Sequence, residues 1–347
     1  MSKKVIINGM GNMGRIITRE IVDNYQTYGM DIVGINDNHT ADAIAYLLKY
    51  DTAYGTWKSD VMAGTANDIL EINGTVIPVG HYSAIDGLIN FIDNESYGGD
   101  ILIECSGTMT AAELRSLQNS SLKLIIACYP VLSNSLGNDF VPIISFGANH
   151  TNFASDMIVC MASPDVQIIT NILRPLPVDY YIAYSSRSNS NSQSVNDNYA
   201  SPAQFGRAAN YNISPTKSLN TTSVHLILPA LNAKGTIIEN RALTIVGGVV
   251  NIAATLNRVV DQDTIINILR ADTPLDIHNG KVYDISTHPL VSSDAINQPY
   301  AGIILQQLVY ANDIGGETQI SISAIYDNYY GQAVQTLREL DYLTQNY

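Results

Sequence analysis

Residues 4–19 read K-V-I-I-N-G-M-G-N-M-G-R-I-I-T-R, and this stretch predicts the fold of the chain. It opens with residues 5–7, a short apolar run that is typical of a buried strand. Gly9, Gly11 and Gly14 follow at the G-x-G-x-x-G spacing, and the residues after them have helical character. A strand, a glycine turn and a helix in this order are typical of the first unit of a dinucleotide-binding domain.

Each glycine has its own physical role in such a turn. Gly9 makes the tight bend, Gly11 lets a pyrophosphate approach the backbone, and Gly14 lets the helix pack on the strand. The phosphates would bind the free N–H groups at the start of the helix. The predicted cofactor contacts in this turn are Gly9, Met10, Gly11, Asn12 and Met13.

A second apolar run, at 32–35, is followed by Asn36 and Asp37. Asp37 comes 23 residues after Gly14, close to the ~20 expected for an acid that binds the adenosine ribose hydroxyls. A carboxylate at this place repels the 2′-phosphate of NADP. The sequence therefore predicts NAD as the cofactor.

Composition limits the classes of function. The chain has 347 residues, which suggests two domains at ~150 residues each. Its net charge is −14, so we expect no sequence-independent binding of nucleic acid and no attraction to an anionic membrane. No apolar run reaches the ~18 residues of a membrane-spanning helix.

The three cysteines, Cys105, Cys128 and Cys160, lie in apolar, strand-like surroundings without metal-ligand spacing. No secretory signal precedes residue 8. We therefore expect reduced thiols, no metal site and a cytoplasmic location.

The first half of the chain predicts strands alternating with helices. A helix is expected at 41–50 and another at 111–117, with a hairpin of 69–72 and 76–79 around Asn73-Gly74. Further buried strands are expected at 101–104, 124–127 and 141–146. This pattern predicts a doubly wound parallel (Rossmann) sheet, whose ligands lie beyond the carboxyl ends of the strands. Ser106 and Gly107 are therefore either cofactor contacts or a simple strand-end turn.

The second half predicts an α+β domain with a mostly antiparallel sheet. After an apolar run at 157–162, Ser163-Pro164-Asp165 signals the start of a helix that ends near residue 174. By composition alone, 186–199 is a flexible polar linker. The remaining strands and helices are expected at 180–184, 237–244, 249–256, 261–269, 319–325 and from 332 onward.

Eight short motifs, in this order, make the chain resemble phosphorylating glyceraldehyde-3-phosphate dehydrogenase over its full length. They are NGMGNMGR at 8–15, IND at 35–37, YDT at 50–52, ECSG at 104–107, GANH at 147–150, GRAA at 206–209, VSSD at 291–294 and YDN at 326–328. The resemblance implies an NAD-binding domain of residues 1–153 and 331–347, and a catalytic-type domain of residues 154–330. It also implies a homotetramer, with the polar run from Ser186 as an ordered loop at a subunit interface.

The chain departs from the family at the two residues that carry the reaction. The family's nucleophilic cysteine corresponds to Pro164, or to Ile168 if a later run is matched instead. The family's general-base histidine corresponds to Ser186 or to Ile182. No register restores either group, because Cys160 is the last cysteine and no histidine occurs between 150 and 225.

Other family positions are kept. Arg241 matches the arginine that binds the substrate phosphate, and Ser163 lies at the start of the same anion site, so a small phosphorylated ligand is a possible partner. Asn328 matches the asparagine that holds the nicotinamide amide. Ala127 replaces a family serine near the cofactor, and Asp165 would repel an anion at the helix start.

Three functions remain open at this stage. The first is an NAD-binding, catalytically disabled homologue with a regulatory or scaffold role and no catalytic residue. The second is an oxidoreductase that transfers hydride to NAD from an aldehyde or hydroxy acid without a covalent thioester. The third is an interaction protein that no longer binds the nucleotide.

Overall fold

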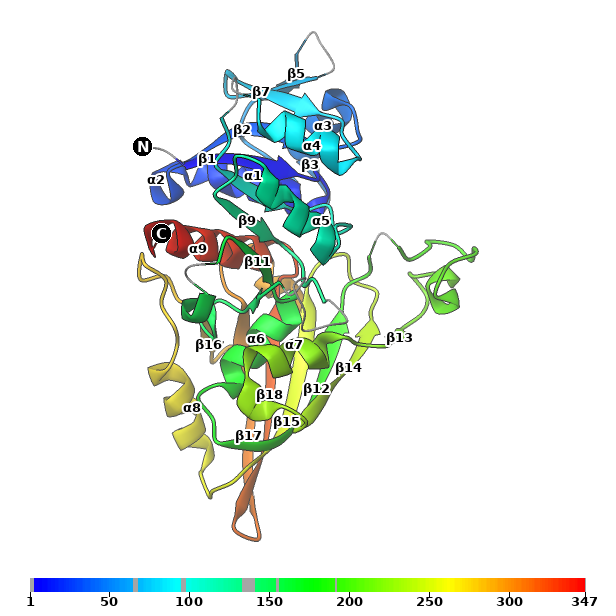
Figure 1. Ribbon diagram of the computed structural model, residues 1–347. Coiled ribbons are helices and arrows are strands. Elements are labelled where there is room, and N and C mark those ends of the chain that lie inside the picture. The colour runs from blue at the N-terminus through cyan, green and yellow to red at the C-terminus, as the bar shows by residue number, and fades with distance from the viewer. Residues whose placement is uncertain are drawn as a thin grey trace. The chain divides into compact units, whose positions relative to one another are not determined.

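The computed structural model describes residues 3–64, 68–94, 98–132, 141–153, 156–190 and 192–346 (Figure 1). The chain forms two compact units. Unit 1 comprises Met1–Ile144, Thr151–Ala162 and Thr336–Tyr347, and unit 2 comprises Ser145–His150 and Ser163–Gln335. The domain boundary predicted at 153/154 adjoins residues 154 and 155, which lie outside the described residues.

Unit 1 is built on a nine-stranded sheet in the order β10-β11-β9-β8-β1-β2-β7-β6-β5. The pairs from β10 to β7 are parallel, and β7-β6 and β6-β5 are antiparallel. The strands are β1 Lys3–Asn8, β2 Met30–Asn36, β5 Val61–Ala63, β6 Ile69–Ile72, β7 Thr75–Gly80, β8 Ile101–Glu104, β9 Leu124–Ala127, β10 Ile143–Ile144 and β11 Ile158–Met161. A two-stranded hairpin, β3 Tyr50–Asp51 and β4 Gly55–Thr56, is separate from this sheet.

Helices α1, α4 and α5 lie in the connections between parallel strands of the nine-stranded sheet, and α3 leads from β2 to the hairpin β3-β4 (Figure 1). Their bounds are α1 Asn12–Asp23, α2 Tyr25–Tyr28, α3 Ala41–Lys49, α4 Ile85–Ile92 and α5 Ala111–Ser116. The central strands have apolar, almost completely buried middles, as in residues 5–7, 101–103 and 124–127, which is expected for parallel strands that are covered on both faces. The predicted Rossmann sheet is confirmed.

Unit 2 contains a seven-stranded mixed sheet in the order β13-β14-β12-β15-β18-β17-β16. Two pairs, β12-β14 and β16-β17, are parallel, and the other four are antiparallel. The strands are β12 Val178–Arg187, β13 Ser214–Thr216, β14 Gly235–Arg241, β15 Gly248–Leu256, β16 Tyr283–Ser286, β17 Gly302–Ile314 and β18 Glu317–Tyr326. The helices are α6 Pro164–Leu173, α7 Asn220–Ile227, α8 Gln262–Ala271 and α9 Tyr330–Asn346, whose later turns belong to unit 1.

Several sequence predictions need correction. The strand expected at 141–146 is only two residues long, because only Ile143 and Ile144 pair with β11. The longest strand, β17, was not predicted, and neither were helices α4 and α7. The first residues of β17 are buried, and its last residues are largely exposed. The strand therefore lacks the regular alternation of buried and exposed residues that predicts a strand.

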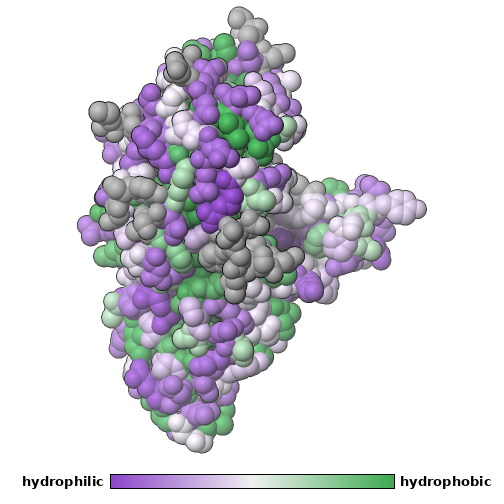
Figure 2. All heavy atoms as spheres, viewed as in Figure 1, coloured by the Kyte–Doolittle hydropathy of each residue, from purple (hydrophilic) through white to green (hydrophobic). Residues whose placement is uncertain are grey.

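The polar run after Ser186 is not a flexible linker. Ser186 and Arg187 continue β12, and the arm that follows, residues 192–213, is held by backbone hydrogen bonds of its own. Asn198 N–H donates to the carbonyl of Gly206 at 2.8 Å, and Ala209 N–H donates to that of Ser194 at 2.8 Å. Figure 2 shows the arm as a projection on which hydrophilic and hydrophobic residues are mixed.

No helix among the described residues is long and apolar enough to cross a membrane.

Glu339, in the unit 1 part of α9, is a buried carboxylate with neither oxygen hydrogen-bonded within the described part of the chain. Burial raises the pKa of Glu339 well above its ordinary value, so the folded state retains a proton that the unfolded chain releases. This group therefore supports folding below about pH 4.5, and its contribution is lost as the pH rises toward the folded-state pKa.

We expect Glu339→Met to stabilise the protein by about 1–3 kcal/mol at pH 8, because it removes an unsatisfied buried acid. Urea unfolding at pH 8 and pH 4.5 measures the effect. The gain should shrink at pH 4.5, and an equal gain at both pH values would show that the carboxylate is not the cause.

Candidate functional site

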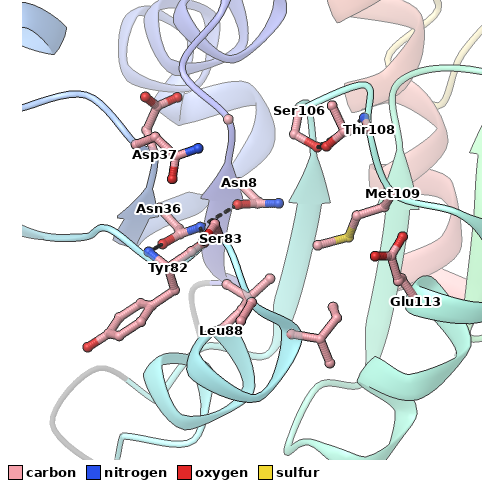
Figure 3. A pocket seen from close by; sticks show the side chains of 14 residues that line it. Asn8, Asn36, Asp37, Tyr82, Ser83, Leu88, Ser106, Thr108, Met109 and Glu113 are labelled. Atoms are coloured by element: carbon pink, nitrogen blue, oxygen red, sulfur yellow. Dashed lines mark hydrogen bonds between the residues drawn. The ribbon is translucent and has the colours of Figure 1, made fainter.

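A cleft of about 190 Å³ lies at the carboxyl ends of the parallel strands in unit 1. Figure 3 shows side chains from β1, β2 and the segments after β7 and β8 around it. This is the edge where a doubly wound sheet binds its ligands. The lining includes Asn8, Gly9, Asn36, Asp37, Tyr82, Ser83, Leu88, Ser106, Thr108, Met109 and Glu113.

The glycine turn beside the cleft can be filled only by glycine at two of its three positions. Gly9 has φ +91°, and a Cβ there would lie 2.6 Å from the backbone nitrogen of Ser106. A Cβ on Gly14 would lie 2.0 Å from the carbonyl oxygen of Gly9, so the helix rests directly on the strand end. At Gly11, by contrast, an added Cβ would have no described atom within 4 Å apart from the local backbone of Gly11 itself. Gly11 thus leaves open space where the motif predicts a pyrophosphate.

Asp37 lies directly after β2, and its carboxylate reaches the glycine turn. Its Oδ2 accepts a hydrogen bond of 2.6 Å from the N–H of Met10, while Oδ1 accepts one of 2.8 Å from the N–H of His39. Burial alone raises the pKa of Asp37, but these hydrogen bonds and the His39 ring bring it below its ordinary value. Asp37 is therefore ionised at neutral pH and lines the cleft, where the sequence predicts that it accepts hydrogen bonds from the ribose hydroxyls.

A buried polar chain supports the floor of the cleft. The amide nitrogen of Asn36 donates to Asn8 Oδ1 at 2.7 Å and to the carbonyl of Tyr82 at 2.9 Å (Figure 3). Asn8 donates in turn to Glu104, which is fully buried at the end of β8. The chain crosses three neighbouring strands, so it fixes their ends relative to one another. These residues were not predicted as site residues, although polar side chains ending apolar strands were a readable signal.

Ser106 and Gly107 follow β8 at the same edge. The N–H and hydroxyl of Ser106 donate to Glu104 Oε1 at 2.6 and 2.5 Å, and Gly107 has φ +73°. Burial raises the pKa of Glu104, which the hydrogen bonds from Ser106 and Asn8 partly offset. Ser106 thus lines the cleft with its backbone held by the buried acid.

In unit 2, the start of α6 has a carboxylate where the sequence predicts an anion site. Asp165 is completely buried, and its Oδ1 accepts a hydrogen bond of 2.7 Å from the hydroxyl of Ser163. Asn220 donates to both Asp165 oxygens at 3.2 and 3.0 Å. Ser163 precedes the helix, but its side chain does not cap the backbone as predicted, because it binds Asp165 instead.

Two arginines and a second acid complete this cluster. Burial alone raises the pKa of Asp165, but the Arg187 guanidinium and the hydroxyls of Ser163 and Ser185 bring it below its ordinary value. Arg187 Nη1 also lies 3.7 Å from Glu239 Oε2. Arg241 is the fourth member, and its electrostatic partners include Glu239 and Asp165. The cluster therefore contains two acidic residues and two arginines. Its formal charges cancel without a bound ligand.

The alternation of β12 decides which of its residues face the cluster. Ser185 is buried, and both it and Arg187 interact with Asp165. Ile182 and Ser186, the two positions predicted for the family histidine, have the opposite parity and lie on the other face of the strand. Neither residue therefore faces the start of α6, and which of the two corresponds to the family histidine stays a prediction.

The remaining predicted residues have separate partners in unit 2. Pro164 is the first residue of α6, whereas Ile168 is one turn further on and is buried against Gly302. Arg241 Nη1 donates to the carbonyl of Ser188 at 3.1 Å, and its Nε is buried with no hydrogen-bond partner among the residues that the structure describes. Asn328 Oδ1 accepts from the N–H of Gly247 at 2.8 Å.

No group of three or more His, Cys, Asp or Glu side chains among the described residues is arranged to hold a metal ion.

Comparison with known proteins relates both units to one family. Residues 3–112 match the family model described as glyceraldehyde 3-phosphate dehydrogenase, NAD binding domain, and residues 166–328 match that of its C-terminal domain. The plasmid glyceraldehyde-3-phosphate dehydrogenase of Cupriavidus necator is 28% identical over 338 residues, which is 95% of each chain. The glyceraldehyde-3-phosphate dehydrogenase of Pseudomonas aeruginosa is 27% identical over 308 residues, covering 87% of this chain and 88% of that protein. NAD is the cofactor that these matches support.

The glycine turn yields a paired prediction. Gly11→Ala should leave the free energy of unfolding within about 0.5 kcal/mol of the native value, since its Cβ enters open space. It should weaken NAD binding by about tenfold or more, or 1.4 kcal/mol, because a methyl group then meets the pyrophosphate.

Gly14→Ala is the matched control for this prediction. It should destabilise the fold by about 1–3 kcal/mol, because its methyl group overlaps the Gly9 carbonyl. Denaturant unfolding and calorimetric titration with NAD separate the two effects. Equal destabilisation by both variants would contradict the assigned roles.

The cluster around Asp165 yields a prediction of anion rescue. Asp165→Ala removes one partner of a buried charge network and should cost about 3–5 kcal/mol of stability. It also leaves a net positive site, which inorganic phosphate should fill. The melting temperature of the variant should therefore rise in phosphate relative to chloride at equal ionic strength by more than that of the native protein.

Asp165→Asn, which retains hydrogen bonding without the charge, is the matched variant for this test. Phosphate should raise its melting temperature in the same way, and the substitution itself should cost less stability than Asp165→Ala. If phosphate raises the melting temperature of the native protein and of both variants equally, the Asp165 carboxylate does not occupy the place of a bound anion.

Proposed function

The chain belongs to the glyceraldehyde-3-phosphate dehydrogenase family, and we propose that it is an NAD-binding member without the family's phosphorylating dehydrogenase activity. We propose a regulatory or scaffold role in which NAD occupancy, rather than turnover, is the functional state. The observation that carries this proposal is the buried Asp165 at the start of α6, where the family reaction needs a nucleophile and an anion.

The missing nucleophile removes the covalent route. A thiolate would form a thiohemiacetal with the aldehyde, and Pro164 at the start of α6 has neither a nucleophilic atom nor an N–H. Cys160 does not replace it, because it is fully buried in β11 and burial raises its pKa to about 12. The absence of an imidazole on this face of β12 would by itself cost ~10²–10⁴-fold.

The electrostatics of the cluster also disfavour a phosphorylated substrate. A substrate phosphate near Asp165 would meet a fixed negative charge, which costs on the order of 1–4 kcal/mol at 4 Å between the water and protein-surface limits. The Ser163 hydroxyl is already bound to that carboxylate. Of the two residues predicted to bind the substrate anion, only Arg241 has an unpaired buried N–H, so a weakly held phosphorylated ligand would depend on it.

We also propose a homotetramer, as the family resemblance implies. The arm of residues 192–213 supports this, since it exposes Tyr199, Tyr211 and Ile213 to solvent in a single chain. Exposed aromatic and aliphatic side chains on an ordered arm are typical of a surface that is buried by another protein. The cytoplasmic location remains a prediction from the cysteine content.

A second candidate is an active NAD-dependent oxidoreductase that transfers hydride without a covalent intermediate. The unpaired Nε of Arg241 favours it, because a buried guanidinium N–H is suited to a carboxylate or phosphate of a substrate. Asn328 would then hold the nicotinamide amide, as the resemblance implies.

The decisive experiment combines NAD titration with a turnover assay. We expect calorimetry to detect NAD binding, and we expect no NADH formation above the protein-free rate with glyceraldehyde-3-phosphate, NAD and phosphate. NADH formation with that substrate would refute the main proposal. Formation only with other aldehydes or hydroxy acids would support the second candidate, and absence of any heat with NAD would refute both.

A further inference from the structure

Two of the three cysteines meet at the edge of the cofactor cleft. The register of β8 and β9 pairs Glu104 with Ala127, the last residue of each strand, so that Cys105 and Cys128, which directly follow the two strands, lie side by side. Their sulfur atoms are 3.3 Å apart, and Cys128 N–H donates to the carbonyl of Glu104 at 2.9 Å. This pair was not predicted, because 23 residues separate the two cysteines along the chain.

We propose that Cys105 and Cys128 form a dithiol modification site, which a peroxide oxidises to a disulfide at the edge of the NAD cleft. The backbone geometry suits this bond. Neighbouring parallel strands are about 4.8 Å apart, which falls within the Cα separation of about 4.4–6.8 Å found in disulfides. The sulfur atoms need to approach only from 3.3 Å to a bond length of about 2 Å.

The two thiols have different exposure, which assigns them different roles. Cys105 is partly exposed, whereas Cys128 is 5% exposed. The Cys105 sulfur attacks one peroxide oxygen, which gives a sulfenic acid and one water. The Cys128 sulfur then displaces the sulfenic hydroxyl as a second water and forms the S–S bond. Both thiol protons leave in the two waters, the sulfurs are oxidised, and the peroxide oxygens are reduced.

Cys160 is a natural control within the same sheet. It pairs with Ala127, one position before Cys128, where side chains point to the opposite face. Its sulfur accepts a hydrogen bond of 3.4 Å from the N–H of Val131. Cys160 is therefore close in the sheet but separated from the pair by the strand itself.

Burial sets the rate of the reaction. It raises the pKa of Cys105 well above the ordinary thiol value, with further contributions from Cys128 and Glu104. Little thiolate is then present at neutral pH, so oxidation should be slow and should need peroxide well above trace amounts. Once formed, the sulfenic acid has a second thiol in contact with it, so the disulfide should outcompete further oxidation.

The disulfide should also alter the cofactor cleft. Ser106 follows Cys105 directly and lines the cleft, with its N–H bound to Glu104. Drawing the Cys105 sulfur toward Cys128 strains this short connection and shifts Ser106. We expect NAD binding to weaken by about tenfold on oxidation. This part rests on NAD binding, whereas formation of the disulfide does not.

The test treats the folded protein with hydrogen peroxide, then unfolds it to block the remaining thiols, and identifies linked peptides by mass spectrometry. We expect a loss of about 2 Da, a Cys105–Cys128 linked peptide and one alkylated residue, Cys160. Dithiothreitol should restore the mass and the affinity for NAD. A linkage through Cys160, or three alkylated thiols after prolonged treatment, would overturn the proposal.

Two variants complete the test. Cys128→Ser should stop the reaction at Cys105 sulfenic acid, which dimedone traps, and should leave no linked peptide. Cys160→Ser should behave as the native protein. If the disulfide forms but NAD affinity does not change, the proposed effect on the cleft is wrong. If the native protein binds no NAD, the linked peptide still decides whether the modification site exists.

Discussion

The need to satisfy one buried charge, the carboxylate of Asp165, organises the part of this protein where its family does chemistry. A fully buried ion is costly unless it is paired and hydrogen-bonded. Here Ser163 and Asn220 donate to it, and Arg187 supplies the opposite charge. Each of these groups is thereby used within the protein. The Asp165 carboxylate is therefore satisfied from within the protein, and of the cluster's groups the Nε of Arg241 is left without a partner among the described residues.

The cofactor side follows a different physical rule. In unit 1 the turn is shaped by close backbone contacts, with Gly14 against Gly9 and Gly9 against Ser106. Such contacts leave no room for an added methyl group, but they involve backbone atoms and need no particular side chain. A dinucleotide cleft of this kind persists as long as the strand ends stay in register, and the buried chain from Asn36 through Asn8 to Glu104 keeps them so. The contacts that shape this cleft therefore do not depend on the residues around Asp165.

Much of the fold could be predicted because its signals are local. The strands β8 and β9 have the bounds expected from their apolar runs, and α6 begins at the predicted proline. The predictions failed where long-range pairing decides the structure. β17 loses its alternation beyond its buried start, and β12 extends into a polar run because its two neighbouring strands pair with it there. Composition alone suggested a linker, since it contains no information about partners that are distant in sequence.

Three features could be predicted without a structure: the family, the NAD-type fingerprint and the absence of a cysteine or histidine in every register. These are facts of residue identity and spacing, which folding cannot change. Folding alone buries Asp165 among partners from α7 and β12, turns Ile182 and Ser186 away from it, and brings Cys105 into contact with Cys128. The physical reason is that strand register and side-chain face are set by hydrogen bonds between segments far apart in the chain, and a shift of one residue would reverse each of these outcomes.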